Sequence, residues 1–227
     1  LPGAGSIVGE KLGRHAEVDM VSFTGSTETG RLFLKYSSES NLKKTVLECG
    51  GKNPAVVFND AENLDLVAEH IVNGAFWNMG ENCSAISRLI VHKDIKSELL
   101  KKIVDRLRDW KTGDPLDPQN HLGALIDKEH CKKVSRYLSQ GAVIGGKMDG
   151  SFVAPTIYET TTDDKRARDE IFGPILSVLE VQTNEEAISM ANKTEYGLTA
   201  SIFSANTRNA LRGSREIKAG TVTVNSY

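Results

Sequence analysis

Residues 53–92 read "NPAVVFNDAENLDLVAEHIVNGAFWNMGENCSAISRLIVH" and contain the pattern that decides the fold. The run at 53–58 is short and apolar, which is typical of a buried strand. Residues 63–77 have helical spacing of apolar side chains, at Leu64, Val67, Ala68, Ile71 and Ala75. A second strand-like run follows at 87–92. A strand, a helix of more than ten residues and another strand predict a βαβ unit with parallel strands.

The same alternation extends along the chain on both sides of this unit. Strands are expected at 17–23, 141–146, 152–158, 175–181, 199–204 and 221–225. Helices are expected at 27–38, 94–110, 128–138, 183–193 and 206–220, the last of them ended by Gly220. The predicted fold class is therefore α/β, with mainly parallel sheets covered by helices on both faces. Two glycines and a polar pair at 50–53 predict a domain boundary, with 1–50 in one domain and 51–227 in another.

Composition argues against nucleic acid and membrane surfaces as partners. The chain has 227 residues, 39% hydrophobic and 26% charged, which is typical of a globular protein with a sizeable core. Its net charge is -2, and the densest basic cluster, "KKIVDRLRDWK", is interrupted by Asp105 and Asp109. A polyanion would need a continuous basic patch, which this pattern does not provide.

Three widely spaced cysteines, Cys49, Cys83 and Cys131, are an odd number in a chain that does not need disulfides. A reducing, cytoplasmic setting is therefore expected. No apolar run approaches the roughly 18 residues of a membrane span, and no signal peptide is recognised. Because the chain begins without methionine and stops in mid-pattern after "GTVTVN", it is expected to be a piece of a longer protein.

A glycine-rich stretch, "FTGSTETG", lies between an expected strand and an expected helix. Gly25 and Gly30 let the backbone approach a ligand, and the helix N-terminus with the Ser26 hydroxyl suits a pyrophosphate. The alternative is that Ser26 only caps its helix and the glycines only make turns. Since the stretch lacks the G-x-G-x-x-G form, the pattern alone favours this alternative.

Two further positions suggest covalent chemistry. Glu48, in "TVLECGGKNP", follows an apolar run, so burial at a strand end could make it a general base; the alternative is a surface glutamate before a turn. Cys83 lies in a polar turn, where an exposed thiolate would be a nucleophile. The alternative is a small buried apolar side chain, which is our interpretation of Cys131. None of the five histidines has a setting that identifies it as a partner of Cys83.

The last candidate stretch, "DEIFGPIL", precedes a strand. Glu170 could reach a sugar hydroxyl, and Phe172 could lie against a flat ring. By itself, the stretch is also compatible with a plain loop that exposes an acid.

Six motifs in order resemble the aldehyde dehydrogenase superfamily over essentially the whole chain. They are "FTGSTETG", "LECGGK", "GENC", "EIFGP", "NKTEYGLTA" and "GTVTVN". The resemblance implies an oxidation of an aldehyde to a carboxylic acid that uses NAD, or NADP, and no metal. Cys49 and Glu81 depart from the family's common Leu and Gln, and "GENC" occurs in several branches.

The resemblance also implies a role for each candidate residue. Cys83 would form a thiohemiacetal and, after hydride transfer to the nicotinamide, a thioester that water activated by Glu48 hydrolyses. Gly25, Ser26 and Gly30 would line the adenosine and pyrophosphate side of the cofactor. Glu170 and Phe172 would meet the nicotinamide ribose and ring. Asn192, Gly197 and Asn225 match positions with structural roles.

By the same resemblance, this piece lacks the family's upstream half and its last strand, so alone it is expected to be inactive. The full-length parent is expected to be a homodimer or homotetramer. The substrate branch that it most resembles oxidises amino-aldehydes, such as γ-glutamylamino- or guanidino-butyraldehyde of polyamine breakdown. Two alternatives stay open, a non-catalytic structural or interaction module and a cofactor-independent cysteine esterase.

Overall fold

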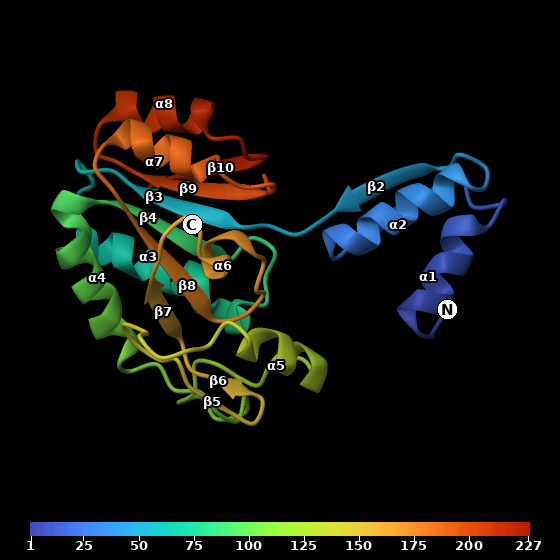
Figure 1. The fold of residues 1–227 in the computed structure, drawn as a ribbon, viewed down its shortest axis with the longest axis horizontal. Coiled ribbons are helices and arrows are strands. Elements are labelled where there is room, and N and C mark those ends of the chain that lie inside the picture. Colours follow the sequence, from blue (N-terminus) through green and yellow to red (C-terminus); the bar gives the residue numbers. More distant parts are fainter. The chain divides into compact units, whose positions relative to one another are not determined.

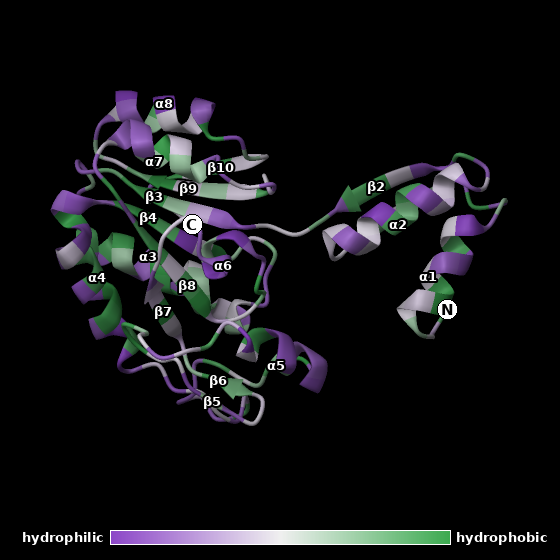
Figure 2. Cartoon of the chain, viewed as in Figure 1, coloured by the Kyte–Doolittle hydropathy of each residue, from purple (hydrophilic) through white to green (hydrophobic).

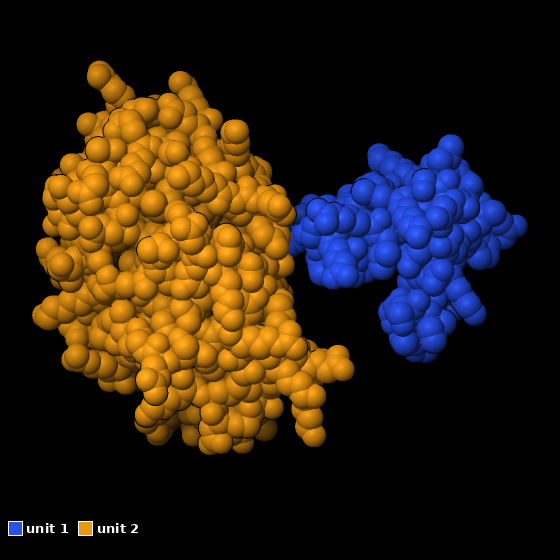
Figure 3. Space-filling view, viewed as in Figure 1, with its two compact units in different colours: residues 1–50 blue, residues 51–227 orange.

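The protein folds into two compact units, Leu1–Gly50 and Gly51–Tyr227. The computed structural model describes all residues, 1–227. Figure 3 colours the two units separately. None of the helices is both long and apolar enough to cross a lipid bilayer.

The larger unit is built on a six-stranded sheet with the order β10-β9-β3-β4-β8-β7 (Figure 1). Every neighbouring pair of strands in it is parallel. The strands are β3 (Asn53–Val57), β4 (Ile86–His92), β7 (Thr156–Glu159), β8 (Ile175–Val181), β9 (Thr199–Phe203) and β10 (Thr221–Val224). The βαβ unit predicted from residues 53–92 is confirmed, because β3 and β4 pair directly.

Helices cover both faces of this sheet, as predicted. Figure 1 shows α3 (Leu64–Phe76) and α4 (Lys93–Leu107) on one side, with α7 (Asn184–Ala191) and α8 (Thr207–Glu216) on the other. The short α6 (Lys165–Arg168) joins the second side. Strand β3 shows why both faces are buried: Ala55 and Val57 pack with α3 and α4, whereas Val56 packs in the opposite cluster. A strand buried on both faces has a continuous apolar sequence, which explains the run at 53–58.

A third apolar cluster lies beside α5 (Lys128–Ser135) and a small antiparallel pair, β5 (Met148–Asp149) and β6 (Phe152–Val153). Cys131 is buried in this cluster, as predicted, with 7% of its surface exposed. Figure 2 shows apolar residues along the central strands and polar residues over α5 and α8. The polar faces of these helices are therefore turned to solvent.

The smaller unit contains α1 (Gly5–Arg14), β1 (Met20–Thr24), α2 (Thr27–Ser38) and β2 (Lys44–Glu48). The two strands are parallel and pair from Met20 with Lys44 to Thr24 with Glu48. In both strands half-buried and exposed residues alternate, because α2 packs against one face of the pair. This alternation is the period of two that is expected of a half-buried strand.

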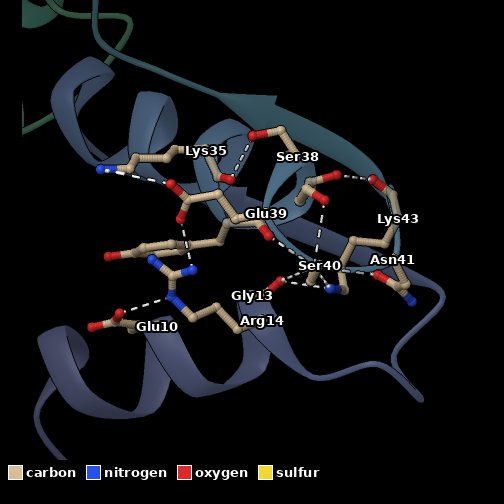
Figure 4. A network of polar contacts seen from close by, with 11 residues as sticks. Glu10, Gly13, Arg14, Lys35, Ser38, Glu39, Ser40, Asn41 and Lys43 are labelled. Carbon is tan, nitrogen blue, oxygen red and sulfur yellow. Dashed lines mark hydrogen bonds and ion pairs between the residues drawn. The ribbon is translucent and has the colours of Figure 1, made fainter.

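Polar contacts join α1 to the C-terminal end of α2 (Figure 4). Arg14 pairs with Glu10 at 2.8 Å and with Glu39 at 2.7 Å, and its guanidinium lies 4.7 Å from the centre of the Tyr36 ring. The buried Lys43 ammonium donates to the Gly13 carbonyl at 2.5 Å. Since Gly13 is in the last turn of α1, this bond also satisfies a helix carbonyl without an intrahelical partner.

Asn192 and Asn225 were interpreted as structural positions. Their side chains form hydrogen bonds with backbone groups of other segments. The Asn192 side chain donates to the Glu216 carbonyl and accepts from the Lys218 N–H, both at 2.8 Å. The Asn225 side chain makes the same two kinds of bond with Ser204. Both asparagines therefore close loops at the ends of strands and helices.

Helix α1 was not predicted from the sequence; it forms although Gly5, Gly9 and Gly13 interrupt its amphipathic pattern. Three local predictions were wrong. Residues 141–146 are not a strand, and only Ile144 bridges to Ile157. The strand expected at 152–158 is divided, because Pro155 has no N–H to donate to a ladder. Helix α8 ends at Glu216, four positions before Gly220.

Candidate active site

Three of the candidate segments meet the sheet at one edge. Gly51 precedes β3, Cys83 precedes β4, and Glu170 precedes β8. Strands β3, β4 and β8 are parallel and adjacent, so their amino ends lie at the same edge of the sheet. In open α/β sheets, ligands usually bind at the carboxyl ends. Here the candidate residues of the larger unit lie instead at the amino ends of the strands.

Cys83 is exposed, so the interpretation as a small buried apolar side chain is wrong. Helix α3 ends at Phe76, and the following turn, η1 (Trp77–Gly80), contains left-handed residues. These include Asn78 with φ 51° and Met79 with φ 56°. Non-glycine residues in this region cost about 1 kcal/mol or more, so the surrounding contacts must hold the turn in place.

Residues 81–85 carry Cys83 and are called the cysteine turn below. Asn53 is the main anchor of this turn. Its amide nitrogen donates to the carbonyl of Cys83 at 2.7 Å and to that of Ala85 at 3.0 Å. Its amide oxygen accepts from the N–H of Thr199 at 3.1 Å. The side chain is buried, with 3% exposed, so these bonds replace its hydration. The sequence did not mark Asn53 as functional, although a polar residue beginning an apolar strand was a usable signal.

Gly51 lies directly against this anchor. A Cβ atom at Gly51 would lie 2.7 Å from the Cys83 carbonyl oxygen and 2.6 Å from Asn53 Oδ1. Only glycine fits that approach. The N–H of Gly51 also donates to Glu170 Oε1 at 3.0 Å, across 119 positions of sequence. Gly51 therefore connects the cysteine turn with the segment that carries Glu170.

Glu170 and Phe172 are both half-exposed, so neither side chain is in the core. The hydrogen bond from Gly51 engages Glu170 Oε1 and leaves the second carboxylate oxygen for another donor. Phe172 has a left-handed backbone, with φ 60°, between the buried Ile171 and Gly173. The segments that carry Cys83, Glu170 and Phe172 thus lie at the amino ends of adjacent strands, and their shared role in one site stays a prediction.

A hollow of about 660 Å³ adjoins Glu170. It is lined by two segments, Arg168, Asp169 and Glu170 in one and Lys193, Thr194, Glu195 and Tyr196 in the other. Burial raises the pKa of the Tyr196 hydroxyl, and the carboxylates of Glu170 and Asp169 add to this effect. The size is that of a small-molecule site, and the walls are polar.

The smaller unit carries the other candidates, and two of them touch. The N–H of Gly25 donates to the Glu48 carbonyl at 3.0 Å, which places the glycine loop beside the end of β2. Ser26 caps α2, because its hydroxyl oxygen accepts from the Thr29 N–H at 3.2 Å. The same hydroxyl donates to Thr29 Oγ1. The capping role is therefore shown, and the N–H groups of Thr27 and Glu28 keep no intrahelical partner.

The surroundings of Gly30 and Glu48 differ from those expected from the sequence. Gly30 is buried, and a Cβ there would lie 2.8 Å from Cys49 Sγ, so its missing side chain allows α2 to pack on the end of β2. Cys49 thus fills space beneath the helix. The Glu48 side chain is exposed, so burial of this carboxyl group, expected from its place at the end of a strand, is not observed.

Lys52 was missed in the sequence, although a lysine within "GGKNPAVVF" is an unusual charge in an apolar run. Its side chain is 1% exposed, and its ammonium makes no hydrogen bond. Burial, with the nearby Arg88 guanidinium as a second cause, lowers the pKa of Lys52 to about 7. The carboxylates of Asp169 and Glu170 oppose this shift. Arg88 itself is buried but donates to three carbonyls, those of Lys52, Met190 and Ala191.

Replacing Lys52 with methionine should change how stability depends on pH. The folded-state pKa is about 7 and the ordinary value is 10.5, so between these values the unfolded chain binds more protons. The free energy of unfolding of the wild type should rise with pH relative to Lys52→Met, by up to about 1.4 kcal/mol per pH unit. Below the folded-state pKa both states are charged and the difference should level off, with methionine the more stable.

The measurement is chemical denaturation of both proteins from about pH 6 to pH 9, which gives the free energy of unfolding of the larger unit at each pH. Lys128→Met, which removes an exposed lysine, is the matched control and should show no such slope. A wild-type to Lys52→Met difference that is constant with pH would contradict the buried, partly neutral lysine.

No group of three or more His, Cys, Asp or Glu side chains is arranged so that it could hold a metal ion. Among the histidines, His130 contacts Glu81 and Phe172, His92 contacts Asp94, and His121 stacks on Trp110. No hydrogen bond joins a histidine to Cys83.

The family model described as "Aldehyde dehydrogenase family" matches residues 1–227. This chain belongs to the aldehyde dehydrogenase family. The structure agrees with solved aldehyde dehydrogenases over its whole length. It has a TM-score of 0.97 and 42% identity to the aldehyde dehydrogenase KauB from Pseudomonas aeruginosa, of which it covers 48%. The α/β fold class is thereby confirmed.

Two further members have names that describe their substrates. This aldehyde dehydrogenase chain is 58% identical, over its full length, to aminoacetaldehyde dehydrogenase of Pseudomonas aeruginosa, of which it covers 47%. It has a TM-score of 0.96 and 43% identity to γ-glutamyl-γ-aminobutyraldehyde dehydrogenase from Burkholderia cenocepacia, covering all of this chain and 48% of that one. The chain thus spans about half the length of the relatives it matches.

Proposed function

We propose that the protein containing this chain oxidises an aldehyde to a carboxylic acid with NAD(P)+, through a covalent intermediate on Cys83. The observation that carries the proposal is the exposed Cys83, whose carbonyl is held by Asn53 beside the Gly51 bond to Glu170. This arrangement supports the proposal, because the proposed nucleophile and a carboxylate with one oxygen left for another donor belong to segments at the same edge of the sheet. A covalent route splits a difficult reaction into two easier steps.

The residues present fit a dinucleotide. In the larger unit, the free oxygen of Glu170 can accept from a ribose hydroxyl, and Phe172 can contact the nicotinamide ring. In the smaller unit, the N-terminus of α2 offers the free N–H groups of Thr27 and Glu28 to a phosphate, beside Gly25. Ser26 and Gly30 support this loop through the cap and the close packing on Cys49. NAD(P)+ supplies the acceptor for the hydride released from the substrate carbon.

The proposed sequence uses Cys83 and then Glu48. The Cys83 thiolate attacks the aldehyde carbon, forming a C–S bond and a thiohemiacetal. Loss of hydride from that carbon leaves a thioester. Glu48 then removes a proton from water, which attacks the thioester carbonyl; the C–S bond breaks, and the acid and the Cys83 thiolate are released.

We further propose an amino-aldehyde as the substrate, in a cytoplasmic homodimer or homotetramer acting in polyamine breakdown. The support is similarity to aminoacetaldehyde and γ-glutamyl-γ-aminobutyraldehyde dehydrogenases. The test is NADH absorbance with the full-length protein, comparing aminoacetaldehyde, a longer amino-aldehyde and an uncharged aldehyde of equal length, each with NAD+ and NADP+. No turnover with any of these aldehydes would remove the proposed oxidation. A preference for the uncharged compound would remove only the substrate proposal.

Thiol reactivity tests the role of Cys83 separately. Iodoacetamide should label Cys83 well before Cys49 and Cys131 in the native protein, since thiolate fraction and access govern the rate. Cys83 is exposed, Cys49 half-buried and Cys131 buried. Mass spectrometry of peptides after timed labelling gives the three rates. Equal rates in a folded sample would contradict the proposed nucleophile and favour a non-catalytic module.

A further inference from the structure

Glu81, two positions before Cys83, has a buried carboxylate with defined partners. Its side chain is 8% exposed. Oxygen Oε1 accepts from the N–H of Ile126 at 3.1 Å and lies 3.3 Å from His130 Nε2. A buried carboxylate is costly unless it is paired and hydrogen-bonded, so this contact anchors the start of the cysteine turn to helix α5.

His130 contacts a second segment at the same nitrogen. Its Nε2 lies 2.5 Å from the carbonyl oxygen of Phe172, and the two rings meet edge to face with centroids 6.1 Å apart. A carbonyl oxygen only accepts, so Nε2 carries the proton and donates. One imidazole N–H is therefore directed at Phe172 and lies within reach of Glu81.

The two segments that His130 joins also touch each other and are both strained. Gly80 has φ 67°, and a Cβ there would lie 2.6 Å from the Gly173 carbonyl oxygen. Asn78, Met79 and Phe172 have left-handed backbones. Such conformations persist only where neighbouring contacts over-determine them. The Glu81–His130 contact is a side-chain connection between the two strained segments.

We propose that Glu81 and His130 are positioning residues that hold the Cys83 turn and the Glu170–Gly173 segment in one fixed arrangement. Neither side chain contacts the thiol, and His130 acts through Phe172, the residue proposed to meet the nicotinamide ring. The consequence for the reaction rests on the proposed function. The pair would keep the substrate carbon on Cys83 and the nicotinamide ring at Phe172 in the geometry that hydride transfer requires. A misplacement of about 1 Å can lower such a rate by about 100-fold.

The test uses three variants of the full-length protein. His130→Leu keeps a similar volume without a donor, and His130→Gln restores an N–H donor at the end of the side chain. Glu129→Gln removes an exposed carboxylate from the same helix and is the control. Amide hydrogen exchange is measured in peptides covering 78–85 and 170–174, and the rate of the first-turnover NADH burst is measured with the proposed aldehydes.

We expect His130→Leu to speed exchange in both peptides and to slow the burst by about 10- to 100-fold. We expect His130→Gln to restore most of the exchange protection and most of the burst rate. Glu129→Gln should change neither the exchange rates nor the burst rate. Unchanged exchange in His130→Leu, or no recovery in His130→Gln, would overturn the pair. Faster exchange with an unchanged burst would overturn its role in the reaction. If His130→Leu speeds exchange but the wild type itself shows no turnover, the pair is sustained as a structural connection and the proposed oxidation is rejected.

Discussion

Replacing Glu48 with glutamine in the full-length protein should leave one rapid turnover and then a very slow steady state. Glutamine keeps the shape of the side chain and removes the base. Capture by Cys83 and release of hydride should survive, because neither needs Glu48 in the proposed sequence. Hydrolysis of the thioester should fall by about 10²–10⁴-fold, the usual effect of losing a general base.

Stopped-flow absorbance should show a burst near one NADH per active site, and intact mass should show an acyl group on Cys83. Glu17→Gln, which changes an exposed carboxylate elsewhere in the smaller unit, is the control and should turn over normally. Unchanged steady-state turnover in Glu48→Gln would remove Glu48 from the mechanism. Loss of the burst as well would mean that Glu48 acts earlier, in activating the thiol.

Replacing Cys83 with alanine should have the largest effect of all. Without a nucleophile neither the thiohemiacetal nor the thioester can form, so both the burst and the steady state should disappear. Loss of a catalytic nucleophile can lower turnover on the order of 10⁶-fold. Binding of NAD+, measured by calorimetry, should persist, because Cys83 is not among the groups proposed to hold it.

Cys131→Ala is the matched control for Cys83→Ala. It also removes one thiol, but from the buried cluster beside α5. Its turnover should stay close to that of the wild type, while its melting temperature falls, because a small cavity is left in the core. Turnover retained in Cys83→Ala would exclude the covalent route, and loss of NAD+ binding would mean that the substitution disturbs the cofactor site itself.

Much of the fold could be predicted because its signals are local. Strand β3 is buried on both faces and therefore reads as a continuous apolar run, and α3 repeats its apolar residues at helical spacing. The failures were local conflicts. Three glycines concealed the apolar face of α1, and the apolar residues at 141–146 form a loop that reaches β7 by one bridge.

The candidate residues were predicted from six short motifs, and their ordered combination identified the family. Motif order does not describe contacts, so the roles that depend on packing were only partly visible. Gly30 matched a cofactor motif, yet its missing side chain makes room for Cys49. Glu81 was visible only as a departure from the usual Gln, and its partner His130 had no distinctive sequence setting.

By itself, the sequence determined most of the strands and helices and the family, and it supplied the proposal of Cys83 as nucleophile, because periodicity and motifs are properties of neighbouring residues. Only the tertiary structure decided that the amino ends of β3, β4 and β8 share an edge. It also decided that Gly51 bonds to Glu170 and that His130 joins Glu81 to Phe172. These contacts link residues far apart in the chain through strand order and burial, and neither is encoded in the local pattern around any one of them.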